Sequence, residues 1–228
     1  MPIVGYSRAS SAFNPVTGIA WAHAYWAEGP EFVALGYANA ATVGTFPDEI
    51  GTADLIQASP VNTYRSTGFN SHPTVQAEAG SAKRMAATFT SIAQPFTVVA
   101  VLNNIGGGVL ISNNTADTSW AFQKSTAWNI YGGSAVIGGG TPNNSAHLMV
   151  GVFNGASSKV IVDGVTLVTG SAGTVSASAM TLFGLSTTAT FNVSNGCQVP
   201  FAAIAPSVLG TADLAALLSW SQGHYATP

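Results

Sequence analysis

Hydrophobic and polar positions alternate over short distances along most of this chain, which predicts β-strands rather than helices. The clearest run is Phe96-Thr97-Val98-Val99-Ala100-Val101-Leu102, which is almost continuously apolar and β-branched. Such a run is typical of a strand that is buried on both faces. Shorter runs of the same kind predict strands at 109–111, 120–122, 128–131, 180–183 and 199–205, the last of them ended by Pro206.

A meander of three strands is the most specific local pattern. Apolar residues 147–153 precede Asn154-Gly155 and a short connection, residues 159–162 precede Asp163-Gly164, and residues 165–169 return. Asn-Gly and Asp-Gly favour tight hairpin turns, because both central positions of a type I′ turn need a positive φ. The pattern therefore predicts three adjacent antiparallel strands.

Helical patterning is confined to two segments. Near the C-terminal end, Thr211 is a suitable helix cap and Asp213 favours a first turn, while Gly223 would end the helix. The apolar stripe of this helix consists of Leu214, Leu217 and Leu218. A second, short helix is predicted over 53–57. Many strands with one terminal helix indicate an all-β fold, a two-sheet antiparallel sandwich with a short C-terminal helix.

The first twenty residues are less regular than the rest. We expect residues 1–20 to be an N-terminal arm and residues 21–228 to form a single sandwich domain. The arm is apolar at Ile3, Val4 and Tyr6 but too short to fold alone. These three side chains are therefore candidates for anchoring the chain to a partner during assembly.

Charged side chains are scarce: the 228 residues include 6 basic and 9 acidic ones, 7% in all, against about 25% in an average soluble domain. With 47% hydrophobic residues the chain is not disordered. Its apolar runs are far shorter than the ~18–20 residues that span a bilayer, so no membrane insertion is expected. The net charge of −3 and the scattered basic residues argue against nucleic-acid binding.

Cys197 is the only cysteine, which excludes an intrachain disulfide and a cysteine-based metal cluster. We expect it to be a small buried hydrophobe. The segment Met1–Arg8 lacks the basic start and apolar stretch of a signal peptide, so we expect synthesis in a cytoplasm without export by that route. So few charges on a cytoplasmic chain favour a surface that is covered by partners in a large assembly.

The acidic residues are not arranged as in a glycosidase. Such an enzyme needs two carboxylates roughly 5–10 Å apart, and on one strand they would stand at alternating positions. No acidic pair is spaced i, i+2, and adjacent Asp48 and Glu49 would face opposite ways. Asp163 belongs to a turn and Asp213 to a helix start. We therefore predict no catalytic residues and no hydrolysis of β-glucans or cell-wall polysaccharide.

The histidines and glycines offer no recognisable site either. The four histidines form no i, i+2 or i, i+4 pair, so neither a metal site nor a cofactor is predicted. If its segment is extended, His23 would share a strand face with Trp21 and Tyr25, and a packed or hydrogen-bonded histidine is the favoured interpretation. The many serines leave a Ser–His–Asp triad open, but no Gly-x-Ser-x-Gly motif supports one. The glycine clusters at 106–108 and 132–140 match no nucleotide motif and are predicted to be hairpin tips and loops.

Aromatic side chains are the best candidates for recognition, because their rings can stack on sugars or anchor a protein interface. Most of them must lie in the core, and we expect one or two to be exposed. The candidates for carbohydrate or partner binding are Trp26, Trp120, Trp128 and Tyr131.

Several short motifs follow one another in a characteristic order. They are Thr45-Phe46-Pro47-Asp48-Glu49-Ile50-Gly51, Pro73-Thr74-Val75, Gln94-Pro95-Phe96-Thr97-Val98-Val99-Ala100-Val101, Ala146-His147-Leu148, Asn154-Gly155-Ala156-Ser157-Ser158-Lys159-Val160, Val162-Asp163-Gly164-Val165 and His224-Tyr225. This order resembles the concanavalin A-like, laminin-G-like jelly-roll domains of bacteriophage virion proteins, particularly tail-associated proteins of phages that infect actinobacteria. The resemblance covers residues 40–226, and the meander is its most specific part.

The resemblance implies an adhesive or architectural jelly roll carried on the virion. It favours a minor tail protein over a capsid decoration or head-fibre protein, with other virion proteins and host cell-surface glycans as partners. Such domains often carry an acidic loop after the Pro-x-Val strand, whereas Ala77–Arg84 here holds one carboxylate and two cations. A calcium ion takes six to eight oxygen ligands, so we expect stability to be independent of calcium.

Two functions from different classes remain open at this point. The first is a virion structural protein. The second is a carbohydrate-active enzyme or free lectin of the same fold, which only the aromatic residues support. So few charges leave a weakly polar surface, and only three lysines can protect the sheet edges. We therefore expect a homo-oligomer, with a trimer as the favoured state.

Overall fold

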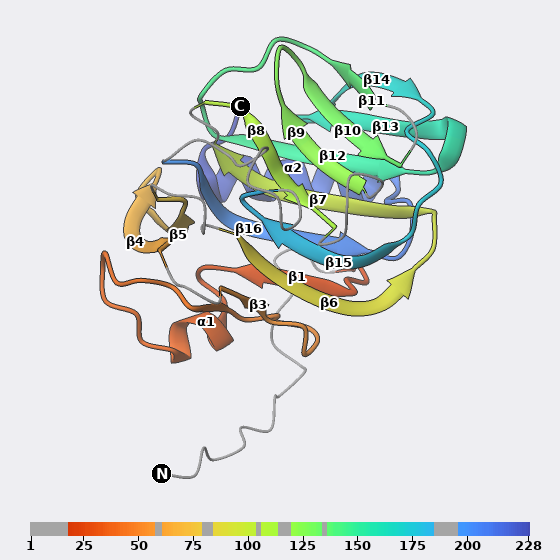
Figure 1. Cartoon of the computed structure of the whole chain (residues 1–228). Coiled ribbons are helices and arrows are strands. Elements are labelled where there is room, and N and C mark those ends of the chain that lie inside the picture. The colour runs from red at the N-terminus through yellow and green to blue at the C-terminus, as the bar shows by residue number, and fades with distance from the viewer. Residues whose placement is uncertain are drawn as a thin grey trace.

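The computed structural model describes residues 18–57, 61–78, 84–103, 106–113, 120–133, 136–184 and 196–228. Within them, two antiparallel sheets of eight strands each form a sandwich, and one long helix lies against it (Figure 1). The all-β, two-sheet fold with a C-terminal helix that the sequence predicts is therefore confirmed.

The first sheet has the strand order β14-β13-β12-β7-β16-β5-β4, with β1 also paired to β16. Its strands are β1 (His23–Trp26), β4 (Thr63–Phe69), β5 (His72–Gln76), β7 (Phe96–Asn103), β12 (His147–Phe153), β13 (Ser158–Val162), β14 (Val165–Gly170) and β16 (Gln198–Ala205). The second sheet has the order β11-β10-β9-β8-β15-β6-β3-β2. Its strands are β2 (Thr45–Phe46), β3 (Leu55–Ile56), β6 (Met85–Ile92), β8 (Gly108–Ser112), β9 (Trp120–Lys124), β10 (Trp128–Gly132), β11 (Val136–Gly139) and β15 (Ala177–Leu182).

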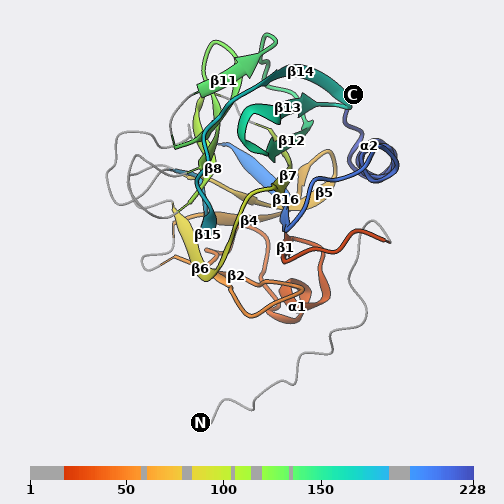
Figure 2. The same cartoon turned by 90° about the vertical axis from the view of Figure 1, so that its right-hand side faces the viewer.

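The helix α2 (Thr211–Tyr225) makes a third layer. Figure 2 views it end-on, with β7 and β16 between it and the strands β8 and β15 of the second sheet. The two faces of β7 belong to different apolar clusters, which explains its continuous apolar run. Val98, Ala100 and Leu102 pack between the sheets, whereas Val99 and Val101 pack on the side of α2. Removal of this apolar surface from water is the main force that holds the layers together.

The meander is built as predicted. β12, β13 and β14 pair in sequence, and the connection after Asn154 is a short 3-10 turn, Gly155–Ser157. Asp163 and Gly164 have φ angles of 49° and 79°, the positive values that the tight turn requires.

The C-terminal helix is confirmed, but both of its predicted ends are wrong. Gly210, not Thr211, precedes the first turn, and its N–H donates to Asp213 Oδ2 over 3.0 Å. The helix continues past Gly223 and ends at Tyr225, because Ala226 adopts a left-handed φ of 52°. Packing of the last turn against the sheet outweighs the weak helix propensity of Gly223.

One local prediction before residue 60 is wrong, and one helix there was not predicted. The helix predicted over 53–57 does not form, because Leu55–Ile56 pairs as β3 with β2 and β6 and the Leu55 side chain enters the core. Instead, a short helix α1 forms at Pro30–Ala34. Glu49 supports its first turn by accepting hydrogen bonds from the N–H groups of Glu31 and Phe32.

The glycine clusters match the predicted hairpin tips and loops only in part. Gly106–Gly108 leads from β7 in the first sheet to β8 in the second, so it is a crossing between sheets and not a hairpin tip. Gly138 and Gly139 lie within β11. A side chain at Gly139 would come within 2.9 Å of the Leu167 carbonyl oxygen, so close packing requires glycine there.

Residues 1–17 lie outside the described residues, and the predicted arm therefore stays a prediction. Ile19, at the end of the arm's predicted range, is buried on the side of α2. Cys197 is buried, as expected, and its thiol donates to the Asn103 carbonyl oxygen. In the described part of the chain, no helix has the length and apolar character needed to span a membrane.

Candidate functional site

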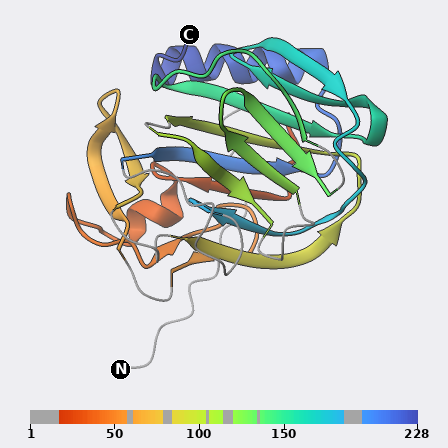
Figure 3. The same cartoon turned by 45° about the horizontal axis from the view of Figure 1, so that its top comes forward.

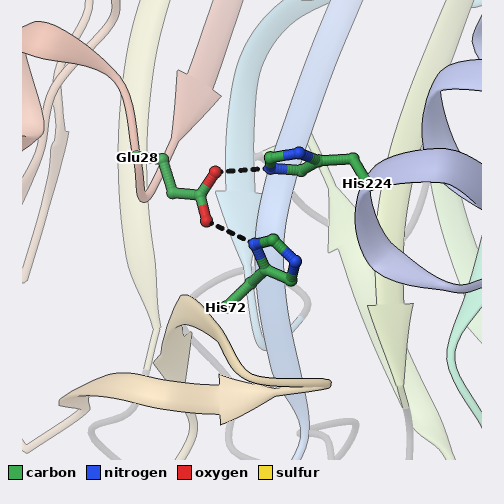
Figure 4. A group of neighbouring side chains, drawn as sticks. All are labelled: Glu28, His72 and His224. Atoms are coloured by element: carbon green, nitrogen blue, oxygen red, sulfur yellow. Dashed lines mark hydrogen bonds and ion pairs between the residues drawn. The ribbon is translucent and has the colours of Figure 1, made fainter.

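Glu28 joins two histidines that are remote from it in the sequence, and Figure 4 shows its carboxylate between their rings. Oε1 of Glu28 lies 2.8 Å from Nδ1 of His72, and Oε2 lies 2.5 Å from Nε2 of His224. The centroids of the two rings are 4.3 Å apart. The side chains of Glu28, His72 and His224 are 18%, 29% and 32% exposed. Solvent can therefore reach this group, which we call the histidine cluster.

Two strands that share one edge of β16 position the first two members. β1 pairs Trp26 with Phe201, and β5 pairs Val75 with Val199. The end of β1 and the last residues of β5 therefore pair with neighbouring stretches of β16. Glu28 stands two residues after β1, and His72 opens β5 directly after the tight turn at Asn70-Ser71.

The third member comes from the last turn of α2. Figure 3 shows that the C-terminal end of this helix lies on the side of the β4–β5 hairpin. Asn70 in the hairpin turn donates to the Tyr225 carbonyl oxygen over 2.7 Å, which fixes the helix end beside His72. His224 precedes Tyr225 and stacks on Trp220 with an interplanar angle of 10°.

Tyr225 and Trp26 make the apolar wall of the cluster. Tyr225 is completely buried, and its hydroxyl accepts a hydrogen bond from Trp26 Nε1 over 2.8 Å. Burial, with a further contribution from the Glu28 carboxylate, raises the pKa of Tyr225 well above its usual range, and the hydrogen bond from Trp26 offsets this only in part. The phenol is therefore a neutral, fixed support for the histidines.

Of the four aromatic residues predicted to bind sugars or partners, Trp26 is the one that lies at this cluster. Its half-buried ring is 6.3 Å from the His224 ring. Trp120 is completely buried against Phe96 and Phe153, so the prediction of a stacking face there is wrong.

Trp128 and Tyr131 lie elsewhere, on β10 of the second sheet. Trp128 is only 2% exposed, so its ring faces cannot stack on a sugar as predicted. Tyr131 is half-buried and packs beside Val109 and Ala121, and its binding role stays a prediction. The arm residues Ile3, Val4 and Tyr6 lie outside the part of the chain that the structure describes.

A polar cavity of about 410 Å³ lies next to the histidine cluster. Two of its lining residues, Asn70 and Ala226, are each two positions from a cluster histidine, so the same segments build both features. Amide side chains from four separate segments line it: Asn70, Asn103, Asn144 and Gln198. We call this feature the amide cavity.

A buried cation supports one wall of the amide cavity. Lys124 is 7% exposed, and its Nζ donates to Asn144 Oδ1 over 2.7 Å and to the Asn143 carbonyl oxygen over 2.8 Å. Burial lowers the pKa of Lys124 from its usual value. Another lining residue, Gln198, bonds to Asn103 and to Gln76. Much of the lining is therefore held in a fixed orientation.

Two neighbouring acidic residues have structural tasks. Asp48 is completely buried and accepts hydrogen bonds from His23 Nδ1 and from backbone N–H groups. Both oxygens of Glu49 point instead to the start of α1, so the two side chains face different ways, as predicted. Burial raises the pKa of Glu49 to about 7, although hydrogen bonds from Glu31 and Phe32 oppose this shift.

The remaining histidines are packed and hydrogen-bonded. His23 stacks on Phe89 and bonds to Asp48, as expected, but Trp21 packs on the opposite face of the first sheet from Tyr25. His147 uses both ring nitrogens, one toward Asp163 and one toward Asn143. Among the described residues, no serine hydroxyl bonds to a histidine.

Sequence spacing did not reveal the histidine cluster. Its members are separated by 44 and 152 positions, and the spacing rules that detect metal sites work only within one strand or helix. Although the histidines form no close pair in the sequence, His72 and His224 come together in space, and one ligand atom from each member of the cluster lies within 4.8 Å of the others. The pairing of β1 and β5 with the same strand is what brings them together.

No family model matches this chain, and no curated protein matches it. Similar solved structures include Trypanosoma rangeli sialidase in complex with sialic acid, with a TM-score of 0.56, 14% identity, and coverage of 83% of this chain and 33% of that one. A structure of botulinum neurotoxin type C gives a TM-score of 0.55 and 12% identity, covering 81% of this chain and 51% of that one. The binding domain of botulinum neurotoxin serotype D/C gives 0.51 and 10%, covering 64% and 43%.

At such low identity the likeness shows the fold alone, a jelly-roll sandwich of two antiparallel sheets. The chain spans about a third of the sialidase and about half of the type C neurotoxin chain.

Proposed function

We propose that this chain is a carbohydrate-binding jelly roll without enzymatic activity, carried on a bacteriophage virion. The amide cavity is the observation that carries glycan recognition. Its volume of about 410 Å³ lies within the range of small-molecule sites. Each amide offers both donors and acceptors, and neighbouring sugar hydroxyls present the same mixture.

The similar structures indicate which glycans to try first. The sialidase was solved with sialic acid, and cell entry of botulinum neurotoxin type C depends on interaction with two ganglioside molecules. Sialylated oligosaccharides are therefore the first probes, with neutral ones beside them. The buried Lys124 behind Asn144 adds positive charge to the wall of the cavity, which favours an acidic sugar.

A glycan array tests this proposal. Asn70 and Asn144 are exposed and line the cavity, so Asn70→Ala and Asn144→Ala should each weaken binding of the best ligand by about tenfold, the effect of losing one or two hydrogen bonds. Gln123→Ala removes an amide from β9 of the second sheet and is the matched control. Absence of any specific ligand, or equal binding by all four chains, contradicts glycan recognition at this cavity.

The virion location rests on different support. The motif order resembles phage tail proteins, and the scarcity of charge suits a chain that partners cover. A minor tail protein is preferred to a capsid decoration or head-fibre protein on that resemblance. Mass spectrometry of purified particles should detect the chain, and immunogold labelling should place it on the tail. A chain abundant in infected lysate but absent from particles would overturn this part of the proposal.

An enzyme of the same fold is the second candidate, because the similar structures include a sialidase. The carboxylates of Asp48 and Glu49 argue against an enzyme, because their oxygens already accept hydrogen bonds from other groups of the protein. We expect no sugar release from β-glucans, cell-wall polysaccharide or sialylated glycans. Release above that of a heat-killed sample, abolished by changing one acidic residue to its amide, would favour the enzyme.

A further inference from the structure

We propose that Glu28, His72 and His224 together bind one divalent transition-metal ion, for which Zn²⁺ is the first probe. The proposal concerns the histidine cluster and is independent of glycan binding in the amide cavity. It rests on three donor side chains from three separate segments that point to one place (Figure 4).

The present distances are close to those that a metal ion needs. Glu28 lies 2.8 Å from His72 and 2.5 Å from His224, and one ligand atom from each of the three residues lies within 4.8 Å of the others. In a tetrahedral zinc site with bonds of about 2.0–2.1 Å, neighbouring ligand atoms are roughly 3.3 Å apart. Each side chain must therefore shift by about 1 Å or less. Partly exposed side chains at the ends of β1, β5 and α2 can make such a shift.

The replacement of the two hydrogen bonds of Glu28 by bonds to a metal ion is chemically simple. In the hydrogen-bonded arrangement one proton lies between each histidine nitrogen and a carboxylate oxygen of Glu28. For that nitrogen to bind a metal, its proton must leave it: a neutral imidazole then carries its proton on the other ring nitrogen, with no net release, and an imidazolium releases one proton to solvent, because imidazole binds metals in its neutral form and the carboxylate in its ionised form. Both oxygens of Glu28 are engaged only by the two histidines in the described ion pairs, so no lysine or arginine pair has to be broken there.

The donor set selects the kind of metal. Two imidazoles and one carboxylate are the ligands of open zinc sites, which keep a fourth position for water or another ligand. Imidazole suits zinc, copper, iron and nickel, whereas calcium takes oxygen ligands. The ring stacking of Trp220 on His224 and the contact of Tyr225 with both histidines hold the imidazoles near the required orientation.

A bound ion would fasten three parts of the fold to one another. Glu28 follows β1, His72 opens β5 and His224 lies in the last turn of α2. The metal would therefore tie the end of the outer helix to the edge of the first sheet. An ion that binds only the folded chain stabilises it by mass action, so the melting temperature should rise with the Zn²⁺ concentration.

The test uses the full chain without an affinity tag, freed of metal with a chelator. Calorimetric titration with Zn²⁺ should give one ion per chain, and Co²⁺ should give the intense visible absorption of a four-coordinate site. Glu28→Gln, His72→Gln and His224→Gln should each weaken Zn²⁺ binding about tenfold or more. His147→Gln, which changes a histidine paired with Asp163, is the matched control and should bind as the wild type does. Calcium should not change the melting temperature of any chain.

Circular dichroism establishes that each variant is folded. If a cluster variant does not fold, His224→Gln is decisive, because its side chain is the most exposed of the three. A folded wild type without Zn²⁺ binding, or equal Zn²⁺ affinity in the wild type and the cluster variants, overturns the proposal. Glycan binding measured with and without chelator separates the two sites: its persistence without metal leaves the amide cavity in place whatever the cluster does.

Discussion

At the scale of single residues, the histidines of this chain pair with carboxylates from remote segments. All four histidines face a carboxylate: His23 faces Asp48, His147 faces Asp163, and Glu28 serves both His72 and His224. Asp48 is the most enclosed of these carboxylates. Burial alone would raise the pKa of Asp48, but hydrogen bonds from His23, Gly51 and Ala24 lower it below its usual value.

Asp48→Asn should lower the free energy of unfolding at pH 7 by about 3 kcal/mol, because a buried, multiply hydrogen-bonded carboxylate loses its charge and leaves His23 without its partner. The folded-state pKa lies below the unfolded value of about 3.9. The stabilisation is therefore present above that value and is lost as the pH falls through the folded-state pKa. Urea unfolding of both chains from pH 7 to pH 3 measures this difference.

Asp213→Asn is the control for that series, since it alters an exposed helix-capping contact and should cost about 1 kcal/mol or less. A constant difference between wild type and Asp48→Asn down to pH 3 would show that the charge of Asp48 is not what stabilises the fold.

Residue type alone could not separate the core aromatic residues from the surface ones. The alternation of side chains between the two faces of a strand could have separated some of them. Trp120 stands two positions before Phe122, and Trp128 two before Ile130, so each shares a strand face with another large apolar residue. All four are buried in the core between the sheets. Applied to each tryptophan, the same alternation would have placed these two inside and left Trp26 as the candidate.

At the scale of elements, the sequence predicted well what depends on neighbouring residues. The meander, the buried strand β7 and the C-terminal helix follow from local turns, apolar runs and a leucine stripe. The segment 53–57 was predicted wrongly, because the two-residue strand β3 exists only through pairing with β2 and β6. The histidine cluster was missed for the same reason, since it depends on long-range pairing with β16.

The outer helix offers a test of this three-layer arrangement. Leu217 is completely buried between α2 and the first sheet, so Leu217→Ala should lower the free energy of unfolding by about 2–5 kcal/mol through lost apolar contact and a residual cavity. Ala216→Ser, an exposed change on the same helix, should stay within about 0.5 kcal/mol of the wild type. Denaturant melts compare them, and a loss below 1 kcal/mol for Leu217→Ala would contradict the packing of α2.

At the scale of the whole molecule, the surface carries the exposed apolar side chains expected of a chain that partners cover. Large apolar side chains are exposed at several places, including Val33 and Val165 at 61% and Val208 at 44%. A groove of about 380 Å³ between α2 and the first sheet is lined by Val208 and Leu214, among others. Exposed apolar surface of this kind marks interaction sites when it is contiguous.

We expect the full chain to form a homo-oligomer, with a trimer favoured, and the arm with Ile3, Val4 and Tyr6 to anchor it to the virion. Light scattering on the full chain and on a chain that begins near Thr17 measures self-association. A monodisperse monomer from the full chain at high concentration counts against self-association. Unchanged incorporation of the shortened chain into particles would show that the arm does not anchor the chain.

Nuclear magnetic resonance of the side-chain amides can show whether the amide cavity binds a glycan. The ¹⁵N-labelled chain is titrated with the best ligand of the array, and the variants assign the amide signals. We expect saturable shifts for Asn70 and Asn144, which line the cavity, and none for Gln123 on the second sheet. Saturable binding that leaves Asn70 and Asn144 unshifted, or that shifts Gln123 instead, would contradict glycan binding in the amide cavity.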